Sequence, residues 1–97
     1  MTTRDEYVEK LKAQLDQWNA QISAWEAKAR ESQAEAKLEY EKQLERLRNR
    51  REQAVYQMKL VQNASLEAWQ DLARGADSAW QAMHEAFTKA RSHFDKS

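Results

Sequence analysis

Two histidines, His84 and His93, are the side chains best suited to acid–base or metal chemistry. A metal site on a helix needs two ligands on one face, as in a Glu-x-x-His or His-x-x-x-His pair, and neither histidine belongs to such a pair. The chain has no cysteine, and no serine stands at a suggestive spacing from a histidine and a carboxylate. We therefore predict no metal site, no cofactor, no catalytic residue and no enzymatic activity.

Positive charge that could bind phosphate is concentrated in one arginine cluster, which comprises Arg46, Arg48, Arg50 and Arg51. Glu45 and Glu52 flank the cluster, and the whole chain balances 16 Lys+Arg against 16 Asp+Glu, so no net field attracts a polyanion. We expect these arginines to be solvated or to set the register between helices. Nucleic-acid binding through residues 46–51 is a less favoured alternative.

Aromatic side chains suggest a third kind of functional site, because such rings form ligand cages and stack on nucleic-acid bases. Seven of them lie at helical spacing along the chain: Trp18, Trp25, Tyr40, Trp69, Trp80, Phe87 and Phe94. Rings that share one helix face with aliphatic residues are typical of a packed core. We therefore predict that these aromatics fill the interior of a helical bundle.

The composition indicates that the elements carrying these side chains are helices. One glycine and no proline in 97 residues leave too few turn residues for sheets, tight turns or phosphate-binding loops. This excludes Rossmann, P-loop and all-β folds and predicts a single all-α domain over residues 1–97. No run of about 18 apolar residues is present, and the charged opening Met-Thr-Thr-Arg-Asp-Glu predicts no signal peptide. We expect a cytoplasmic location.

Apolar residues spaced three and four apart draw one stripe along the first two thirds of the chain. The stripe contains Leu11, Leu15, Trp18, Ile22, Trp25, Ala29, Ala36, Tyr40, Leu44, Leu47, Ala54, Met58 and Val61. It predicts one unbroken helix over 3–62. A turn over 63–65 and a second helix over 66–95 follow, because Asn63 suits a helix end and the Ser65 hydroxyl suits a helix start.

The second helix is predicted to fold back antiparallel on the first and form a helical hairpin. In such a hairpin, residues whose numbers sum to about 127 lie at the same level along the two helices, so Phe87 is expected beside Tyr40. Gly75 is expected to be tolerated within the second helix without shifting the phase of its stripe, and the alternative is a kink recapped by Asp77 or Ser78. The hairpin core is predicted to contain Leu44, Met58, Trp69, Leu72, Trp80, Met83 and Phe87.

The second helix is too short to cover residues 7–30, whose apolar stripe must be buried by another helix. The spacing of apolar residues in the first stripe is nearly the same read forward or backward, so its two halves can pack antiparallel on each other. Two architectures would bury the stripe in this way. One is a coiled-coil-like antiparallel homodimer with a three-helix cross-section; the other is a monomeric three-helix bundle with a break near Ser32. Ser32-Gln33-Ala34-Glu35 matches a capping box, which favours the break, but Ser23-Ala24-Trp25-Glu26 matches the same pattern within the stripe. We predict the homodimer, because no Gly or Asn follows Ala29 to end a helix. Its interface would comprise Leu11, Leu15, Trp18, Ile22, Trp25, Ala29, Ala36, Tyr40, Leu47 and Phe94.

A long helix rich in Ala, Glu, Lys and Gln followed by a Trp-rich amphipathic helix resembles short uncharacterised bacterial coiled-coil proteins. The eleven-residue spacing between Ile22 and Leu47 is also similar to that of apolipoprotein and late-embryogenesis helices. The resemblance rests on periodicity and composition and transfers no site. We expect a non-enzymatic structural or protein-interaction coiled-coil module, whose partners are a second copy and an unknown protein. The alternative is an amphipathic protein that binds a lipid or granule surface.

Overall fold

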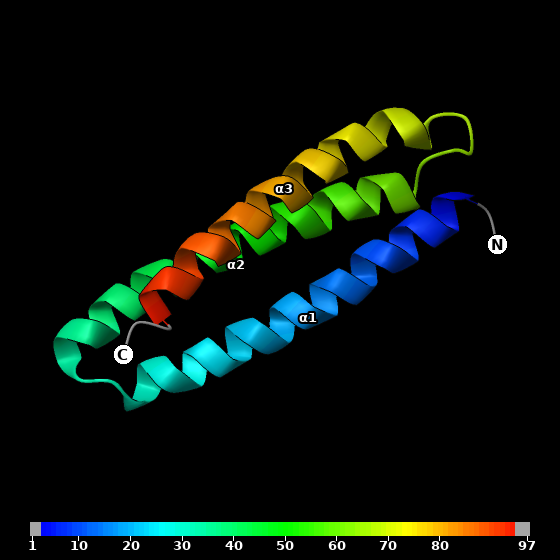
Figure 1. The fold of residues 1–97 in the computed structure, drawn as a ribbon. Helices are drawn as coiled ribbons and strands as arrows, with labels where there is room; N and C mark the ends of the chain where they lie inside the picture. Colours follow the sequence, from blue (N-terminus) through cyan, green and yellow to red (C-terminus); the bar gives the residue numbers. More distant parts are fainter. Residues whose placement is uncertain (1–2, 95–97) are drawn as a thin grey trace.

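The computed structural model describes residues 3–94, whose regular secondary structure is entirely helical. The helices are α1 (Thr3–Glu31), α2 (Ala34–Gln62) and α3 (Trp69–Phe94), and each runs antiparallel to the one before it (Figure 1). They form an elongated bundle of 51 × 19 × 17 Å. The all-α fold class predicted from the composition is confirmed.

The first two helices are separated by a break at Ser32 and Gln33, so the predicted unbroken helix over 3–62 is wrong. The Ser32 N–H donates to the Ala29 carbonyl (3.2 Å), and its hydroxyl donates to the Lys28 carbonyl (2.8 Å). Gln33 takes up extended backbone (φ −70°, ψ 161°) and precedes α2 without a side-chain cap. The alternative with a break near Ser32 describes the chain.

The break is explained by where the apolar stripe of α1 finds cover. Breaking a helix forfeits a few backbone hydrogen bonds, each worth about 1 kcal/mol net. Recruiting a second chain at micromolar concentration instead requires about 8 kcal/mol of net association free energy, on a 1 M standard state. Because α1 packs against α2 and α3 of its own chain, its stripe is buried without a partner. The reason for expecting a homodimer is thereby removed.

The connection between α2 and α3 lies where the sequence predicts it but is longer than 63–65. The Asn63 N–H donates to the Lys59 carbonyl (3.0 Å), which closes the end of α2. The Ser65 hydroxyl accepts from the Ala68 N–H (3.1 Å), so it binds nearby backbone, but not in the first turn of α3 as predicted. This bond closes a turn ahead of α3, which starts at Trp69 rather than at 66.

The third helix continues through Gly75 without interruption. Its predicted end at residue 95 lies outside the described residues. The longer loop shifts α3 along α2, and the ring stacked on Tyr40 is Phe94 (centroids 4.6 Å apart) rather than Phe87. Phe94 lies seven positions after Phe87, about two helical turns, so the shift keeps the apolar face inward.

The core consists of two clusters that follow each other along the bundle. The aromatic cluster lies toward the α1–α2 turn and contains Ile22, Trp25, Ala29, Leu44, Leu47, Met83, Phe87, Ala90 and Phe94. The aliphatic cluster lies toward the α2–α3 loop and contains Val8, Leu11, Ala54, Met58, Val61, Ala73, Ala76 and Trp80. Trp18 packs against both, with ring centroids 5.2 Å from Trp80 and 5.7 Å from Phe87.

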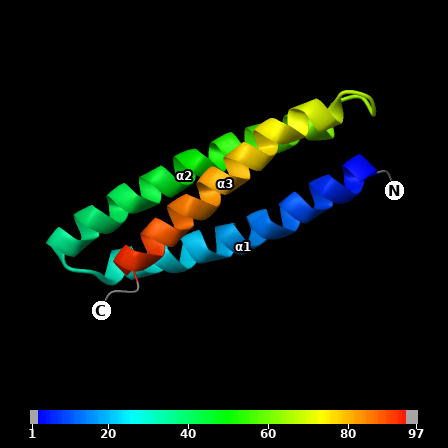
Figure 2. The same cartoon turned by 45° about the horizontal axis from the view of Figure 1, so that its top comes forward.

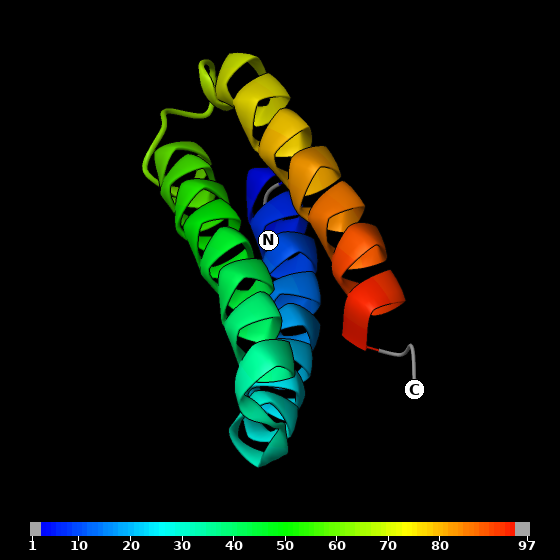
Figure 3. The same ribbon diagram turned by 90° about the vertical axis from the view of Figure 1, so that its left-hand side faces the viewer.

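The path of α3 joins these clusters. Figure 2 shows α3 starting beside α2 and ending near the C-terminal end of α1. There the Phe94 ring stacks on the Trp25 ring, with centroids 4.7 Å apart and 5° between the ring planes. Figure 3 shows α1 lying behind the pair formed by α2 and α3. Surface side chains from two helices meet in grooves between α2 and α3 and between α1 and α3.

Candidate functional site

The residues predicted to form an interface between two chains are mostly covered within one chain. Leu11, Ile22, Trp25, Ala29, Leu47 and Phe94 are buried, and Leu15, Trp18 and Tyr40 are partly buried against the two clusters. Ala36 is exposed in the first turn of α2. Within one chain α2 and α3 supply the helices that cover them, so these residues pack without a second copy, and their place in a contact between chains stays a prediction.

The residues predicted for the hairpin core lie in the bundle interior. Leu44, Met58, Trp80, Met83 and Phe87 are buried, while Trp69 and Leu72 are half-buried against the aliphatic cluster. The apolar face of α3 is thus packed inside the bundle, so this helix would have to leave it to insert into a lipid surface.

The arginine cluster is divided between two faces of α2, and two of its members point to α1. The Arg48 guanidinium forms an ion pair with Glu26 (2.7 Å), and Arg51 donates to the Asn19 side-chain oxygen (3.1 Å). These bonds connect α1 to α2 near the middle of the bundle. They match the expectation that the cluster sets register, and they take two arginines away from any phosphate-binding surface.

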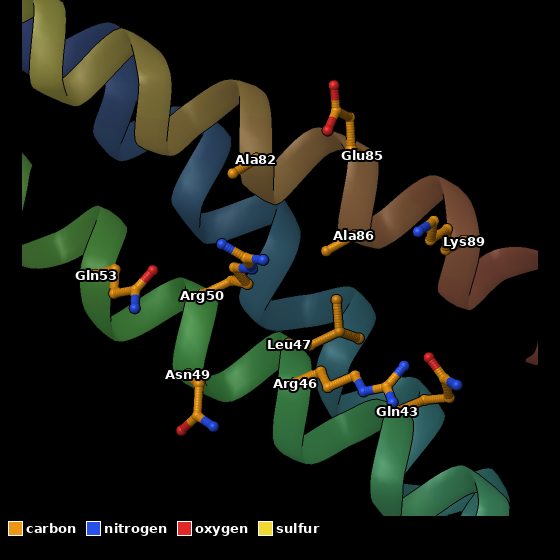
Figure 4. A pocket seen from close by; sticks show the side chains of 10 residues that line it. All are labelled: Gln43, Arg46, Leu47, Asn49, Arg50, Gln53, Ala82, Glu85, Ala86 and Lys89. Atoms are coloured by element: carbon orange, nitrogen blue, oxygen red, sulfur yellow. The ribbon is translucent and has the colours of Figure 1, made fainter.

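The other two arginines, Arg46 and Arg50, line a groove of about 550 Å³ between α2 and α3, which we call the α2–α3 groove (Figure 4). Lys89 lies on the α3 wall. None of these three cations forms an ion pair within residues 3–94. Among residues 3–94, Glu85 is the one acidic residue lining the groove, and Figure 4 shows its carboxylate pointing away from α2. The groove therefore carries an excess of positive charge.

The floor of the α2–α3 groove is apolar and made of small side chains. Figure 4 shows the methyl groups of Ala82 and Ala86 pointing from α3 toward α2, and Leu47 pointing back toward α3. Leu47 is only 1% exposed, whereas both alanines are half-buried. Side-chain amides complete the lining: Gln43, Asn49 and Gln53. A ligand with an apolar strip and flanking negative charge fits such a surface.

A second groove, of about 490 Å³, lies between α1 and α3 and is lined in part by Trp18, Trp80 and His84. The Trp80 indole N–H is buried and has no hydrogen-bond partner among the described residues. The rings of both tryptophans contact each other and belong to the packed interior. We interpret their presence here as the edge of the core reaching the surface.

One end of this second groove is closed by Tyr7. Its hydroxyl donates to the Asp77 carboxylate, and it lies 3.2 Å from the Ala73 carbonyl. Burial, followed by the hydrogen bond and the negative charge of Asp77, raises the pKa of Tyr7 well above its ordinary value. The phenol stays protonated at neutral pH and joins α1 to α3 instead of acting as a base.

The histidines take separate positions. His84 is exposed on α3, and His93 lies in its last turn with Nδ1 3.9 Å from a Glu39 carboxylate oxygen. Within residues 3–94, no three His, Cys, Asp or Glu side chains gather as ligands for a metal ion. None of the helices in the described part is long and apolar enough to cross a bilayer.

Comparison of the chain with protein-family models, curated proteins and solved structures found no match. The α2–α3 groove is thus the candidate site on its own geometry. Sequence reasoning identified Arg46 and Arg50 but missed Lys89 and the alanine floor. Ala82 with Ala86 and Glu85 with Lys89 do repeat at the four-residue helical spacing, but their meeting with Arg46 and Arg50 depends on the register of α3.

Proposed function

We propose that the chain is a non-enzymatic structural and protein-interaction module that binds its partner through the α2–α3 groove. The observation that carries this proposal is the set of three cations, Arg46, Arg50 and Lys89, around a small apolar floor without an ion pair in the described part of the chain. A partner supplying carboxylates gains ion pairs there without breaking any within the bundle.

The contrast with Arg48 supports this proposal. Arg48 lies two positions from both Arg46 and Arg50, yet it is neutralised by Glu26 of α1. The same chain therefore uses arginines in one direction to hold its own helices together and in another to present charge to the exterior. The aliphatic stems of such cations add apolar contact area for a docked protein.

A site-specific photo-crosslink tests the proposal. A benzophenone side chain at Asn49, which lines the groove, is compared with one at Ala13, which is exposed on α1. We expect a discrete protein adduct from Asn49 in an extract of the cells that express the chain, and its loss when Arg50→Glu is added. Absence of adducts at Asn49, or the same adducts from Ala13, contradicts the proposal.

We also propose that the chain associates with itself by exchange of α1. The hinge at Ser32–Gln33 consists of residues that tolerate a helix, and Gln33 has no side-chain cap to hold the turn. If the turn straightens, α1 and α2 form the long helix that the sequence predicts, and α1 finds the same covering surface on a second copy. This retains the predicted antiparallel homodimer as a domain-swapped form.

Solution mass measured by light scattering tests the exchange. Wild-type chain is expected to shift from 11.4 kDa toward twice that mass as concentration rises from micromolar to millimolar. Gln33→Ala should increase the dimer fraction because it favours continuous helix, while Gln33→Pro should abolish it because proline interrupts the straightened helix. A dimer fraction that is the same in both variants would rule out exchange through this hinge.

A further inference from the structure

The α2–α3 groove has a shape that matches a helix laid along it. Its walls are two long helices, α2 and α3, and its floor includes Ala82 and Ala86, which lie one turn apart on α3. Small side chains at that spacing let a docked helix approach to an axial distance near the short end of the usual range, about 8 Å. A fourth helix seated there would turn the three-helix cross-section locally into a four-helix one.

The charges on the walls define what the docked helix must carry. Arg46 and Arg50 are four residues apart on α2, which places their backbones about 6 Å apart along the axis. Carboxylates four residues apart on a partner helix have the same spacing, so two of them can face the two guanidinium groups. Lys89 on the opposite wall calls for a third carboxylate on the other flank.

The apolar floor distinguishes this occupant from other anions. A free phosphate or a nucleic-acid backbone could neutralise the guanidinium groups but would leave the methyl groups of Ala82 and Ala86 facing water. An amphipathic helix covers them with its own apolar strip, and it also covers the aliphatic stems of the three cations. Only an occupant with both properties satisfies the floor and the walls together.

We propose that the α2–α3 groove binds an acidic amphipathic helix of another protein, with its apolar strip on Ala82 and Ala86 and its carboxylates toward Arg46, Arg50 and Lys89. This inference rests on the proposed interaction function and names the class of partner. The binding mode is that of a helix in a groove, in which apolar anchors give affinity and flanking charges set orientation.

Designed peptides serve as the probe. One 18-residue peptide carries a leucine and alanine strip flanked by glutamates; a second carries lysines in place of the glutamates; a third scrambles the first. Binding is measured by fluorescence anisotropy up to about 1 mM, the weak end of specific recognition. We expect the acidic amphipathic peptide to bind and the other two peptides not to bind.

Two triple variants with the same change in net charge locate the binding. The groove variant is Arg46→Gln, Arg50→Gln and Lys89→Gln. The control variant is Arg30→Gln, Lys37→Gln and Lys59→Gln, which removes three exposed cations that do not line the groove. The groove variant should weaken binding about tenfold, as expected when three exposed ion pairs are lost, and the control less than about twofold.

A floor variant separates shape from charge. Ala86→Gln places a longer polar side chain on the floor and leaves the charge unchanged, so it should also weaken binding of the acidic peptide. Circular dichroism and thermal unfolding of each variant verify that the bundle is intact. Amide chemical shifts in the wild-type complex should change in 46–53 and 82–89 and stay constant in the first two turns of α1.

Each contrary result has a defined meaning. If both triple variants weaken peptide binding equally, the attraction is a general charge effect, and the α2–α3 groove is not the binding site. A second contrary result is that an 18-nucleotide DNA strand binds, the groove variant abolishes this binding, and the acidic peptide does not bind. The groove would then be a nucleic-acid site, and the proposal of a docked helix would be wrong. If no peptide binds but Asn49 still crosslinks, the partner class is wrong and the interaction function stands. If Asn49 fails as well, both proposals fall.

Discussion

At the end of the bundle where α1 turns into α2, stacked aromatic rings hold the helices together, whereas at the opposite end polar side chains bind backbone groups beside aliphatic residues and one tilted ring contact, Tyr7 with Trp69. The turn end contains Phe94, which is fully buried and stacked on Trp25 and Tyr40. The Lys28 ammonium also donates to the Phe94 carbonyl, so the last turn of α3 is fastened to α1.

The loop end is held by polar side chains that form hydrogen bonds with individual backbone groups. The Ser65 hydroxyl accepts from the turn before α3, and the Arg4 guanidinium donates to the Ala64 carbonyl. Tyr7 joins α1 to Asp77 of α3. The difference teaches that a turn without Gly, Asn or a side-chain cap on the following helix still forms when a large apolar area is buried beside it, whereas residue types suited to capping define a turn locally.

The largest expected effect is at the turn end. Phe94→Ala removes two ring stacks and leaves a cavity, which should lower the free energy of unfolding by about 3 kcal/mol. Phe94→Leu should cost only about 1 kcal/mol because it retains most of the volume. Urea unfolding measures both, and Leu38→Ala, at a position 67% exposed near the same end, is the control. A loss below about 1 kcal/mol for Phe94→Ala would contradict the dominance of the rings.

A smaller loss is expected at the loop end from Tyr7→Phe. It removes the hydroxyl that donates to Asp77 and should lower the free energy of unfolding by about 1 kcal/mol. A loss as large as that of Phe94→Ala would show that polar contacts dominate at both ends. The double variant with Asp77→Asn measures how much of this loss is the Tyr7–Asp77 bond itself.

The same contact predicts a pH dependence. Burial and Asp77 raise the pKa of Tyr7 in the folded chain above its value of about 10 in the unfolded chain. The folded state therefore binds this proton more tightly, so the stabilisation is complete below about pH 10 and declines as the pH rises further. Urea midpoints at pH 8 and pH 11 should differ more for wild type than for Tyr7→Phe. Parallel declines in the two proteins would remove Tyr7 as the cause.

The two turns should respond to capping changes in opposite directions. Ser65→Ala removes an observed cap and should cost about 1 kcal/mol, while Gln33→Asp adds a missing one and should stabilise by a similar amount. Thermal unfolding measures both changes, and Ser23→Ala on the exposed face of α1 is a control for the loss of a serine hydroxyl. No gain from Gln33→Asp would mean that packing already holds this turn as firmly as a cap does.

The smallest effect is expected at Gly75 in the middle of α3. Alanine there gains up to about 1 kcal/mol of helix propensity. Its Cβ would lie 2.5 Å from the Gln57 side-chain oxygen, so that flexible amide must move and the net gain falls to about 0.5 kcal/mol. Adding Gln57→Ala should restore the full benefit of Gly75→Ala. A net loss that persists in the double variant would show that the backbones, not the side chain, are too close.

The outcome at particular residues shows how far the sequence could be interpreted. Ser65 was identified as a cap because its hydroxyl acts on nearby backbone, which sequence spacing describes directly. The rings of Trp25, Phe87 and Phe94 were placed in the core because their helical spacing is also local. The pairing of Tyr40 with Phe94 was missed, because it depends on a loop whose length is set by how α3 settles on two helices at once.

The amino-acid order by itself determined that the chain is helical, which face of each helix is apolar, and where α2 ends. These properties follow from residue propensity, periodicity and capping within a few positions along the chain. Tertiary packing decided the break at Ser32, the register of α3 and the division of the arginines into internal and outward-facing pairs. The reason is that a continuous helix of good helix formers breaks at its least stable position when the resulting turn lets the chain bury its own apolar stripe.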